Sequence, residues 1–225
     1  MAVVKENLED YNKNMIKQPK CKICRRAGEK LFLKGERCFT PKCALVKRPF
    51  PPGQRAKRRR GGLSEYGREL REKQKIKNSY LLSEKEFRNY VKALLDTKTK
   101  IVEDVPSAFV KSVETRLDNI VFRLGFANSR GEARQMVSHG HFSVNNRKTT
   151  IPSRQIKISD KITIRKESRE KPIFKNIEEK LKKTKIPTWL SMDKKTLEGE
   201  IKRYPKIDDV QLLGELSSVF EHYSR

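Results

Sequence analysis

The residues of this chain best suited to chemistry are its four cysteines, which all lie in the first fifth of the 225-residue sequence. Their spacing is C-x2-C-x13-C-x4-C, formed by Cys21, Cys24, Cys38 and Cys43. Four thiolates spaced in this way can surround one tetrahedral metal ion, and Zn²⁺ is the favoured occupant. The alternatives are an iron–sulfur cluster, disulfides and free buried thiols. Disulfides need an oxidising compartment, and the sequence carries no recognisable secretory signal.

The chain must turn back on itself for the four sulfur atoms to meet. Gly35 and Pro41 lie in the loop that supplies the second cysteine pair. Residues 21–48 are too short and too highly charged to bury much apolar surface. We therefore expect a bound metal to supply the folding free energy of this module.

The charge of the chain points to a polyanionic partner. Lys and Arg number 53 against 28 Asp and Glu, which gives a net charge of +25. Residues 47–75 hold eleven basic side chains and three acidic ones, whereas residues 193–221 are nearly neutral. No apolar run approaches the roughly 18 residues of a membrane span, so we expect no membrane partner. Acidic residues within the first twenty argue against a transit peptide, and the cytoplasm is the expected location.

Capping residues and apolar periodicity predict the helices that carry these charges. After a stiff proline-rich link at residues 49–54, Ser64 can cap a helix that extends to about Lys75. Ser83 and Glu86 form a capping box for a helix through about Leu95. A further helix is predicted from Pro106, with apolar residues at helical spacing as far as Leu124.

Residues 116–165 are predicted to form two helices followed by a small antiparallel sheet. Ser129 can cap a short helix over residues 130–138, and Phe142 and Val144 then alternate as in a strand. Asn145-Asn146 predicts a tight turn, and isoleucines on either side of Ser159-Asp160 predict a second hairpin. The chain as a whole is therefore assigned to the α+β class.

These residues also resemble a known family. The run RLDNIVFRLGFA at residues 116–127, followed by SHGH at 138–141 and Val144-Asn145, is similar to the RNA-binding module of the small-subunit ribosomal protein S-four family. Residues 21–54 resemble the cysteine-bearing form of its amino-terminal module, and residues 63–75 its first long helix. The chain departs from the family at Arg55-Ala56, where His-Gly is common, and at Asn146, where Gly is usual.

The resemblance implies a division of the chain into five parts. These are an extension at 1–20, the four-cysteine module at 21–48, a linker and helical rRNA-binding domain at 49–115, the RNA-binding module at 116–170, and a tail at 171–225 that packs back on the helical domain. Trp189 is expected to pack the tail onto that domain.

The resemblance also implies a role as a structural constituent of the small ribosomal subunit. Members of the family bind the 5′ domain of 16S rRNA and start assembly of the subunit. They also line the channel through which mRNA enters, contact small-subunit proteins three and five, and influence translational accuracy. No small-molecule substrate is implied.

Proteins read double-stranded RNA through its phosphates and 2′-hydroxyls, which calls for Arg and Lys fixed on rigid elements. Arg116, Arg130 and Arg134 are expected on exposed helix faces, and His139, Asn145 and Arg147 near the helix-to-strand turns. The full set of candidate rRNA-binding residues is Arg48, Arg55, Lys57, Arg68, Arg71, Lys73, Arg116, Arg130, Arg134, His139, Asn145 and Arg147. By resemblance, Arg58, Arg59 and Arg60 line the mRNA path.

Three other classes of protein could carry some of these features. An RNA-modifying enzyme such as a pseudouridine synthase would need a second, catalytic domain, and the sequence shows no nucleophile–base pair or phosphate-binding glycine loop. A zinc-bearing DNA binder would usually carry a His pair or dimerisation heptads. A stand-alone RNA-binding stress factor would usually lack the cysteine module and the tail. The chain is therefore not expected to be an enzyme.

Overall fold

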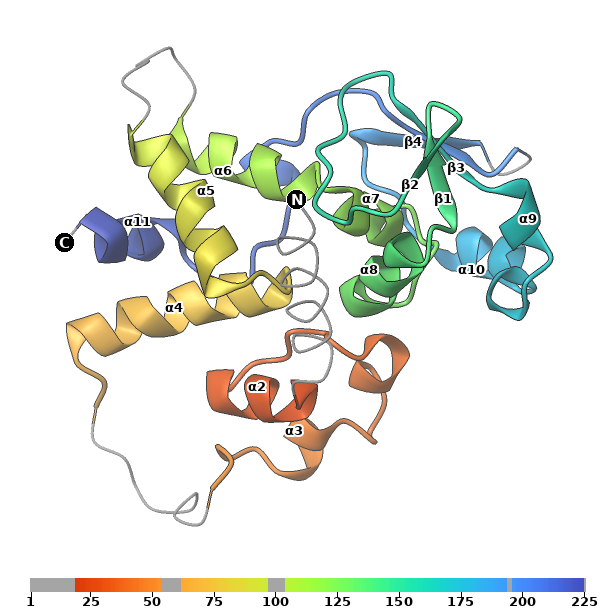
Figure 1. Ribbon diagram of the computed structural model, residues 1–225. Coiled ribbons are helices and arrows are strands. Elements are labelled where there is room, and N and C mark those ends of the chain that lie inside the picture. Colours follow the sequence, from red (N-terminus) through yellow and green to blue (C-terminus); the bar gives the residue numbers. More distant parts are fainter. Residues whose placement is uncertain (1–18, 54–61, 97–103, 194–195, 225) are drawn as a thin grey trace, which may run out of the picture. The chain divides into compact units, whose positions relative to one another are not determined.

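The computed structural model describes residues 19–53, 62–96, 104–193 and 196–224. The described residues divide into two compact units (Figure 1). The first unit combines residues of Met1–Asn89 with those of Leu212–Arg225, and the second comprises Tyr90–Gln211. The boundary falls inside helix α5 (Glu84–Asp96), so it lies earlier than the predicted start of the RNA-binding module.

The first unit is helical. Besides the amino-terminal half of α5, it contains α2 (Lys20–Ala27), the 3-10 helix η1 (Gly35–Cys38), α3 (Ala44–Lys47), α4 (Glu65–Ser79) and α11 (Leu216–Ser224). The Ser64 hydroxyl accepts a hydrogen bond of 3.2 Å from the amide of Gly67 and so begins α4. Ser83 and Glu86 bond each other's amides at 2.9 and 3.0 Å, which confirms the predicted capping box.

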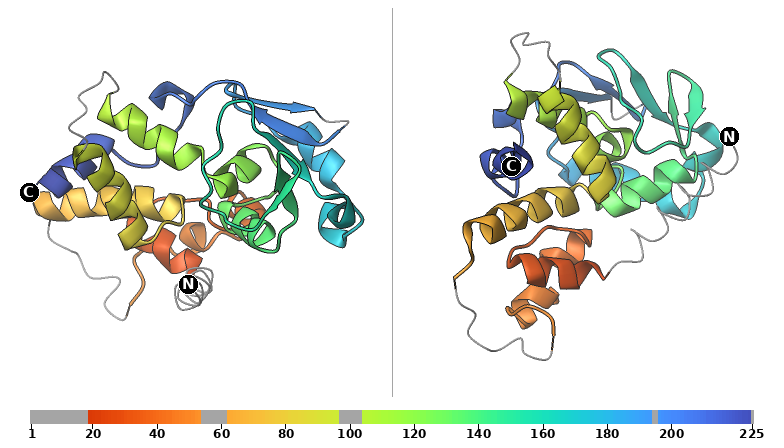
Figure 2. Two further views of the ribbon diagram at one scale, coloured as in Figure 1. Left: turned by 45° about the horizontal axis from the view of Figure 1, so that its top comes forward. Right: turned by 60° about the vertical axis from the view of Figure 1, so that its left-hand side comes forward.

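Two small cores stabilise the first unit. Helix α11 packs against α4, with Ile76 and Val219 fully buried on the two helices, and Figure 2 shows them side by side in both views. A second cluster joins Cys24, Leu31 and Leu33 of the cysteine module to Leu81, which follows α4. A cluster of this size gives little hydrophobic stabilisation, which is the reason for expecting a bound metal to stabilise the cysteine module.

After the carboxyl-terminal half of α5, the second unit contains α6 (Val105–Glu114), α7 (Leu117–Arg123) and α8 (Arg130–Ser138). The sequence predicts one continuous helix from Pro106 to Leu124, and this prediction is wrong because the helix breaks at Thr115 and Arg116. There the backbone pairs with a distant segment: Arg116 bridges Gln155, and the amide of Leu117 donates to the carbonyl of Arg154 at 2.9 Å. The boundaries of α8 and its Ser129 cap are as predicted.

A five-stranded antiparallel sheet follows, in the order β2-β1-β3-β5-β4. Strands β1 (Phe142–Val144) and β2 (Arg147–Thr149) form the predicted hairpin. Asn145 and Asn146 both have positive φ, at 50° and 63°, as a tight two-residue turn requires. The second predicted hairpin is absent from the described residues. Only β3 (Lys161–Ile164) forms there, and it pairs with β1 on one side and with β5 on the other.

The tail does not pack as one piece. Helix α9 (Lys166–Arg169) precedes it. The first part of the tail contains η2 (Pro172–Phe174), α10 (Ile177–Lys183), β4 (Leu190–Asp193), β5 (Glu198–Ile201) and η3 (Ile207–Asp209), all within the second unit. Trp189 is fully buried in the core of this unit, so its expected packing on the helical domain is wrong. From Leu212 onward the tail belongs to the first unit, where α11 packs on α4. Sequence patterns missed β4 and β5 because their pairing with β3 is long-range.

Gly199 explains how β5 reaches this core. A Cβ atom at this position would clash with Cδ1 of Leu124, a carbon of the buried core. Only glycine therefore lets β5 lie this close to the end of α7. No helix among the described residues is long and apolar enough to span a bilayer.

Candidate nucleic-acid interface

The four cysteines come from α2, η1 and the start of α3, and none is in a disulfide. Cys24, Cys38 and Cys43 are buried, while Cys21 is partly exposed. Burial raises the pKa of the Cys24 thiol; a backbone hydrogen bond at Leu31 opposes this, and the charges of the other three cysteines add to it. The other three cysteines therefore lie close enough to Cys24 to affect its pKa. Even so, the described residues contain no group of three or more ligating side chains arranged to hold a metal ion.

Arg116 and Arg134 do not lie on exposed helix faces, and this expectation is wrong. Their exposed fractions are 2% and 3%, and both guanidinium groups bind the buried carboxylate of Asp118. Arg116 Nε lies 3.2 Å from Oδ1, and Arg134 Nε donates to Oδ2 at 2.9 Å. Burial acts to raise the pKa of Asp118, but the charges and hydrogen bonds of the two arginines outweigh it, so this pKa lies below its ordinary value.

A second buried carboxylate, Glu114, organises the neighbouring side chains. It accepts hydrogen bonds of 2.7 and 3.0 Å from Arg123 and one of 2.6 Å from the Asn119 amide. Arg130 donates to the Asn119 oxygen at 2.8 Å and lies over the Phe122 ring. Arg130 is therefore half-buried rather than exposed. These two networks join α6, α7 and α8 through charge-assisted hydrogen bonds.

The turn between β1 and β2 is more accessible. His139, Asn145, Arg147 and the neighbouring Lys148 are all exposed. The Asn145 side chain is used locally, since it donates to Asp160 at 2.7 Å and accepts from the amide of Lys161 at 2.9 Å. Arg147 and Lys148 are exposed side chains of the second unit, so they can contact a ligand without leaving a buried partner.

In the first unit, Arg48, Arg68 and Arg71 are exposed and Lys73 is not. The Lys73 ammonium lies 2.6 Å from Glu84 and 5.3 Å from the centre of the Tyr223 ring, so it joins α4 to α5 and α11. Burial acts to raise the pKa of Glu84, but hydrogen bonds and charges from Lys73 and Lys77 lower it to about 2. The predicted contacts at Arg55, Lys57, Arg58, Arg59 and Arg60 lie outside the described residues.

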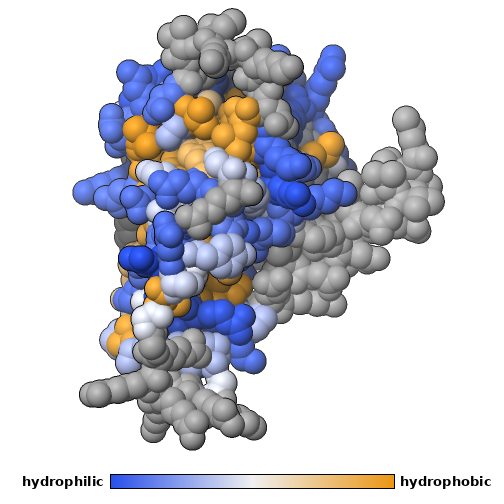
Figure 3. Space-filling model, turned by 90° about the vertical axis from the view of Figure 1, so that its left-hand side faces the viewer, coloured by the Kyte–Doolittle hydropathy of each residue, from blue (hydrophilic) through white to orange (hydrophobic). Residues whose placement is uncertain are grey.

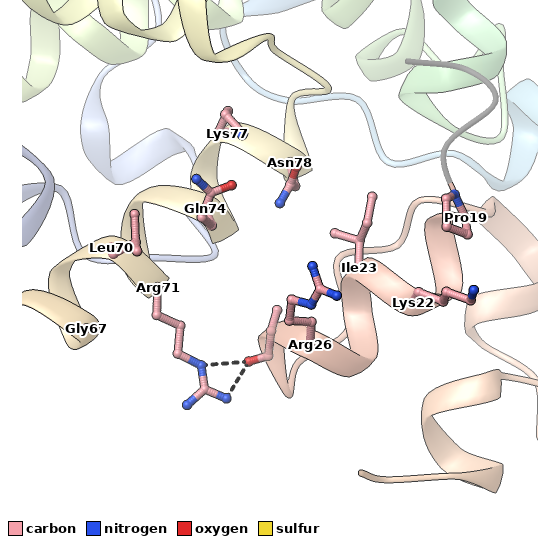
Figure 4. Close-up of a pocket in the computed structure, with 11 residues that line it drawn as sticks. Pro19, Lys22, Ile23, Arg26, Gly67, Leu70, Arg71, Gln74, Lys77 and Asn78 are labelled. Carbon is pink, nitrogen blue, oxygen red and sulfur yellow. Dashed lines mark hydrogen bonds between the residues drawn. The ribbon is translucent and has the colours of Figure 1, made fainter. Parts of the chain in front are cut away.

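Sequence reasoning missed a groove between α2 and α4, which Figure 4 shows in close-up. Its volume is about 530 Å³, and its charged lining residues are Lys22, Arg26, Arg71 and Lys77, with no Asp or Glu. The i,i+4 spacing of Lys22 and Arg26 was a signal in the sequence. The partner helix could not be inferred from it. On the face shown in Figure 3, hydrophilic residues cover most of the visible surface.

Two family models match the chain. The first, described as the ribosomal protein S4/S9 N-terminal domain, matches residues 15–108. The second, described as the S4 domain, matches residues 115–162. The first match contains the cysteine module and α4, and the second contains α7, α8, β1, β2 and the start of β3.

Similar proteins cover nearly the whole chain. The chain is 45% identical to a protein of Caldicellulosiruptor saccharolyticus over 207 residues, which is 92% of this chain and 97% of the relative. It is 44% identical to one of Oleidesulfovibrio alaskensis and 43% identical to one of Thermus thermophilus, with the same coverage. Each of these relatives bears the name small ribosomal subunit protein uS4.

Proposed function

Since the chain belongs to the small ribosomal subunit protein uS4 family, we propose that it is a structural, rRNA-binding protein of the small subunit and not an enzyme. The observation that carries this proposal is 45% identity over 92% of the chain, across both matched domains. The net charge of +25 supports it, because phosphate neutralisation dominates RNA affinity. The corresponding location is the cytoplasmic ribosome.

In finer detail, the proposed target is the 5′ domain of 16S rRNA, where the protein would start assembly of that domain. Arg58, Arg59 and Arg60 would line the channel through which mRNA enters and so influence translational accuracy. Small-subunit proteins three and five are the proposed neighbours. These proposals rest on the resemblance of residues 21–75 and 116–165 to the family.

Exposed cations are the best candidates for direct contact with RNA. In the first unit these are Arg48, Arg68 and Arg71, and in the second Arg147, with Lys148 beside it. Contact through Arg116 or Arg134 would require a guanidinium to leave the Asp118 carboxylate or to share it with a phosphate. We therefore assign these two side chains to the positioning of α7 and α8, and Lys73 to the joining of α4 with α5 and α11.

We also propose that Cys21, Cys24, Cys38 and Cys43 hold a metal, with Zn²⁺ ahead of an iron–sulfur cluster. The donor set fits in kind, because all four cysteines are free thiols and three of them lie close enough to Cys24 to affect its pKa. It does not fit in its present geometry, so the side chains must draw together around the ion. When bound, such an ion would cross-link α2 to the segment from η1 to α3.

Binding to a 5′-domain rRNA fragment tests the function. The fragment is mixed with the protein at about 0.3 M monovalent salt, where non-specific phosphate contacts are weak, in the presence of excess tRNA and duplex DNA. We expect tight binding to the rRNA fragment alone. Equal affinity for all three nucleic acids would contradict the proposal, since the charge would then supply only non-specific attraction.

A further inference from the structure

The groove between α2 and α4 has one closed end. The Arg71 guanidinium crosses from α4 and donates two hydrogen bonds, of 2.8 and 3.1 Å, to the carbonyl of Ala27 at the end of α2 (Figure 4). The helix ends there at Gly28, whose φ is 76°. A Cβ at Gly28 would come within 2.7 Å of Arg71 Nη2, so glycine also makes room for this bond. The two helices are therefore joined on one side of an open space.

The lining combines three kinds of side chain. Arg26 and Lys22 are exposed cations on α2. Ile23, Ala27 and Leu70 supply apolar walls. Gln74 and Asn78 supply amides from α4, and Figure 4 shows Asn78 and Arg26 pointing into the space between the helices.

We propose that this groove binds a single unpaired nucleotide of the RNA. This inference rests on the proposed function and identifies one contact within it. The apolar walls suit the face of a base. The Asn78 amide and the Gln74 side-chain oxygen offer a donor and acceptors to its edge, while the Gln74 nitrogen donates to Glu84 at 3.4 Å. Arg26 and Lys22 suit the adjoining phosphate, since no carboxylate of the lining competes with it.

The size and charge of the groove favour this occupant over others. A volume of about 530 Å³ lies within the range of pockets that enclose small organic molecules, and is larger than a phosphate ion needs. An acidic peptide would match the positive charge of the groove, but it would place no flat ring against the apolar walls. Base pairing buries the edge that Gln74 and Asn78 would read, so the nucleotide must be unpaired.

Chemical probing of the rRNA fragment bound to the full chain tests the inference. The reagent modifies the edges of unpaired bases, and overall affinity is measured in parallel by filter binding. Gln74→Trp fills the groove, and Arg26→Ala removes the phosphate contact. Arg37→Ala is the matched control, because Arg37 is an exposed arginine of the same module outside the groove lining.

We expect the wild-type chain to protect one unpaired base that becomes reactive with Gln74→Trp, while the rest of the footprint remains. Affinity should fall about tenfold with Gln74→Trp, the loss expected for one base contact. Arg26→Ala should reduce the salt slope by about one, and Arg37→Ala should leave the protection of that base unchanged. Thermal unfolding of each variant verifies that the fold is retained.

Two results would overturn the inference. The first is an unchanged footprint with both groove variants while the rRNA still binds tightly. The second is an unchanged footprint together with weakened binding of an acidic protein partner, which would make a peptide the occupant. Failure of the wild-type chain to bind the rRNA would instead contradict the proposed function, so the two failures are distinguishable.

Discussion

The buried arginines of the second unit contrast with the exposed cations that line the groove of the first. In the second unit, Arg116 and Arg134 are buried against Asp118. In the first unit, Lys22 and Arg26 are exposed in a groove whose lining contains no Asp or Glu, although Lys77 of the same lining is bonded to Glu84. The difference teaches that a basic residue in an RNA-binding protein can serve either the fold or the ligand. The position of the nearest carboxylate decides which.

Removal of the metal should have the largest effect, and it should act on the first unit and not on the second. A structural zinc site supplies on the order of 10 kcal/mol of binding free energy, so a chelator should unfold the cysteine module and leave the second unit folded. Hydrogen exchange along the backbone would show protection lost over residues 20–48 alone. Added Zn²⁺ should restore the wild-type chain but not Cys38→Ser. Unchanged protection after chelation would mean that the small core is sufficient by itself. Visible absorption of the purified chain would instead indicate an iron–sulfur cluster.

Asp118→Ala should be the most destabilising single substitution in the second unit. It leaves two buried guanidinium groups without their carboxylate, and the expected loss is about 3–5 kcal/mol in the free energy of unfolding. Denaturant unfolding measures it. Asp208→Ala is the control, because Asp208 is exposed, and its effect should stay within about 0.5 kcal/mol. A loss below 1 kcal/mol for Asp118→Ala would show that the buried network contributes little stability.

Arg68→Ala should weaken RNA binding without affecting the fold. Loss of one phosphate contact predicts a several-fold fall in affinity and a salt slope smaller by about one. Arg203→Ala is the matched control, since Arg203 is paired with Asp209 at 2.6 and 2.8 Å. Filter binding over a range of salt concentrations measures both variants. Equal losses for the two arginines would remove the distinction between exposed and paired cations.

The smallest effect concerns Glu84, whose side chain is half exposed. Its pKa is about 2 in the fold against an ordinary 4.5, because Lys73 and Lys77 outweigh burial. The carboxylate therefore stabilises the first unit fully above pH 4.5, and this contribution is lost as the pH falls towards 2. Glu84→Gln should flatten the pH dependence of stability in that window. If Glu84→Gln left the pH dependence of stability unchanged, the pairing of Lys73 and Lys77 with Glu84 would contribute no stability in this pH window.

Local signals predicted much of the fold. The caps at Ser64, Ser83 and Ser129 begin helices as expected, because each hydroxyl bonds an amide only three residues away. The turn at Asn145-Asn146 is also local. The break after Glu114 was not predictable, since the apolar periodicity continues through it and the cause is the pairing of Leu117 with Arg154. Strands β4 and β5 were missed for the same reason.

The sequence by itself determined the cysteine spacing, the net charge and the family, since composition and order alone carry them. Only the tertiary structure decided which basic residues can meet RNA. Arg134 and Asp118 lie sixteen residues apart on different helices, and the groove joins helices separated by some forty residues. Burial and charge pairing depend on distances in space, and those distances exist only after the helices have packed.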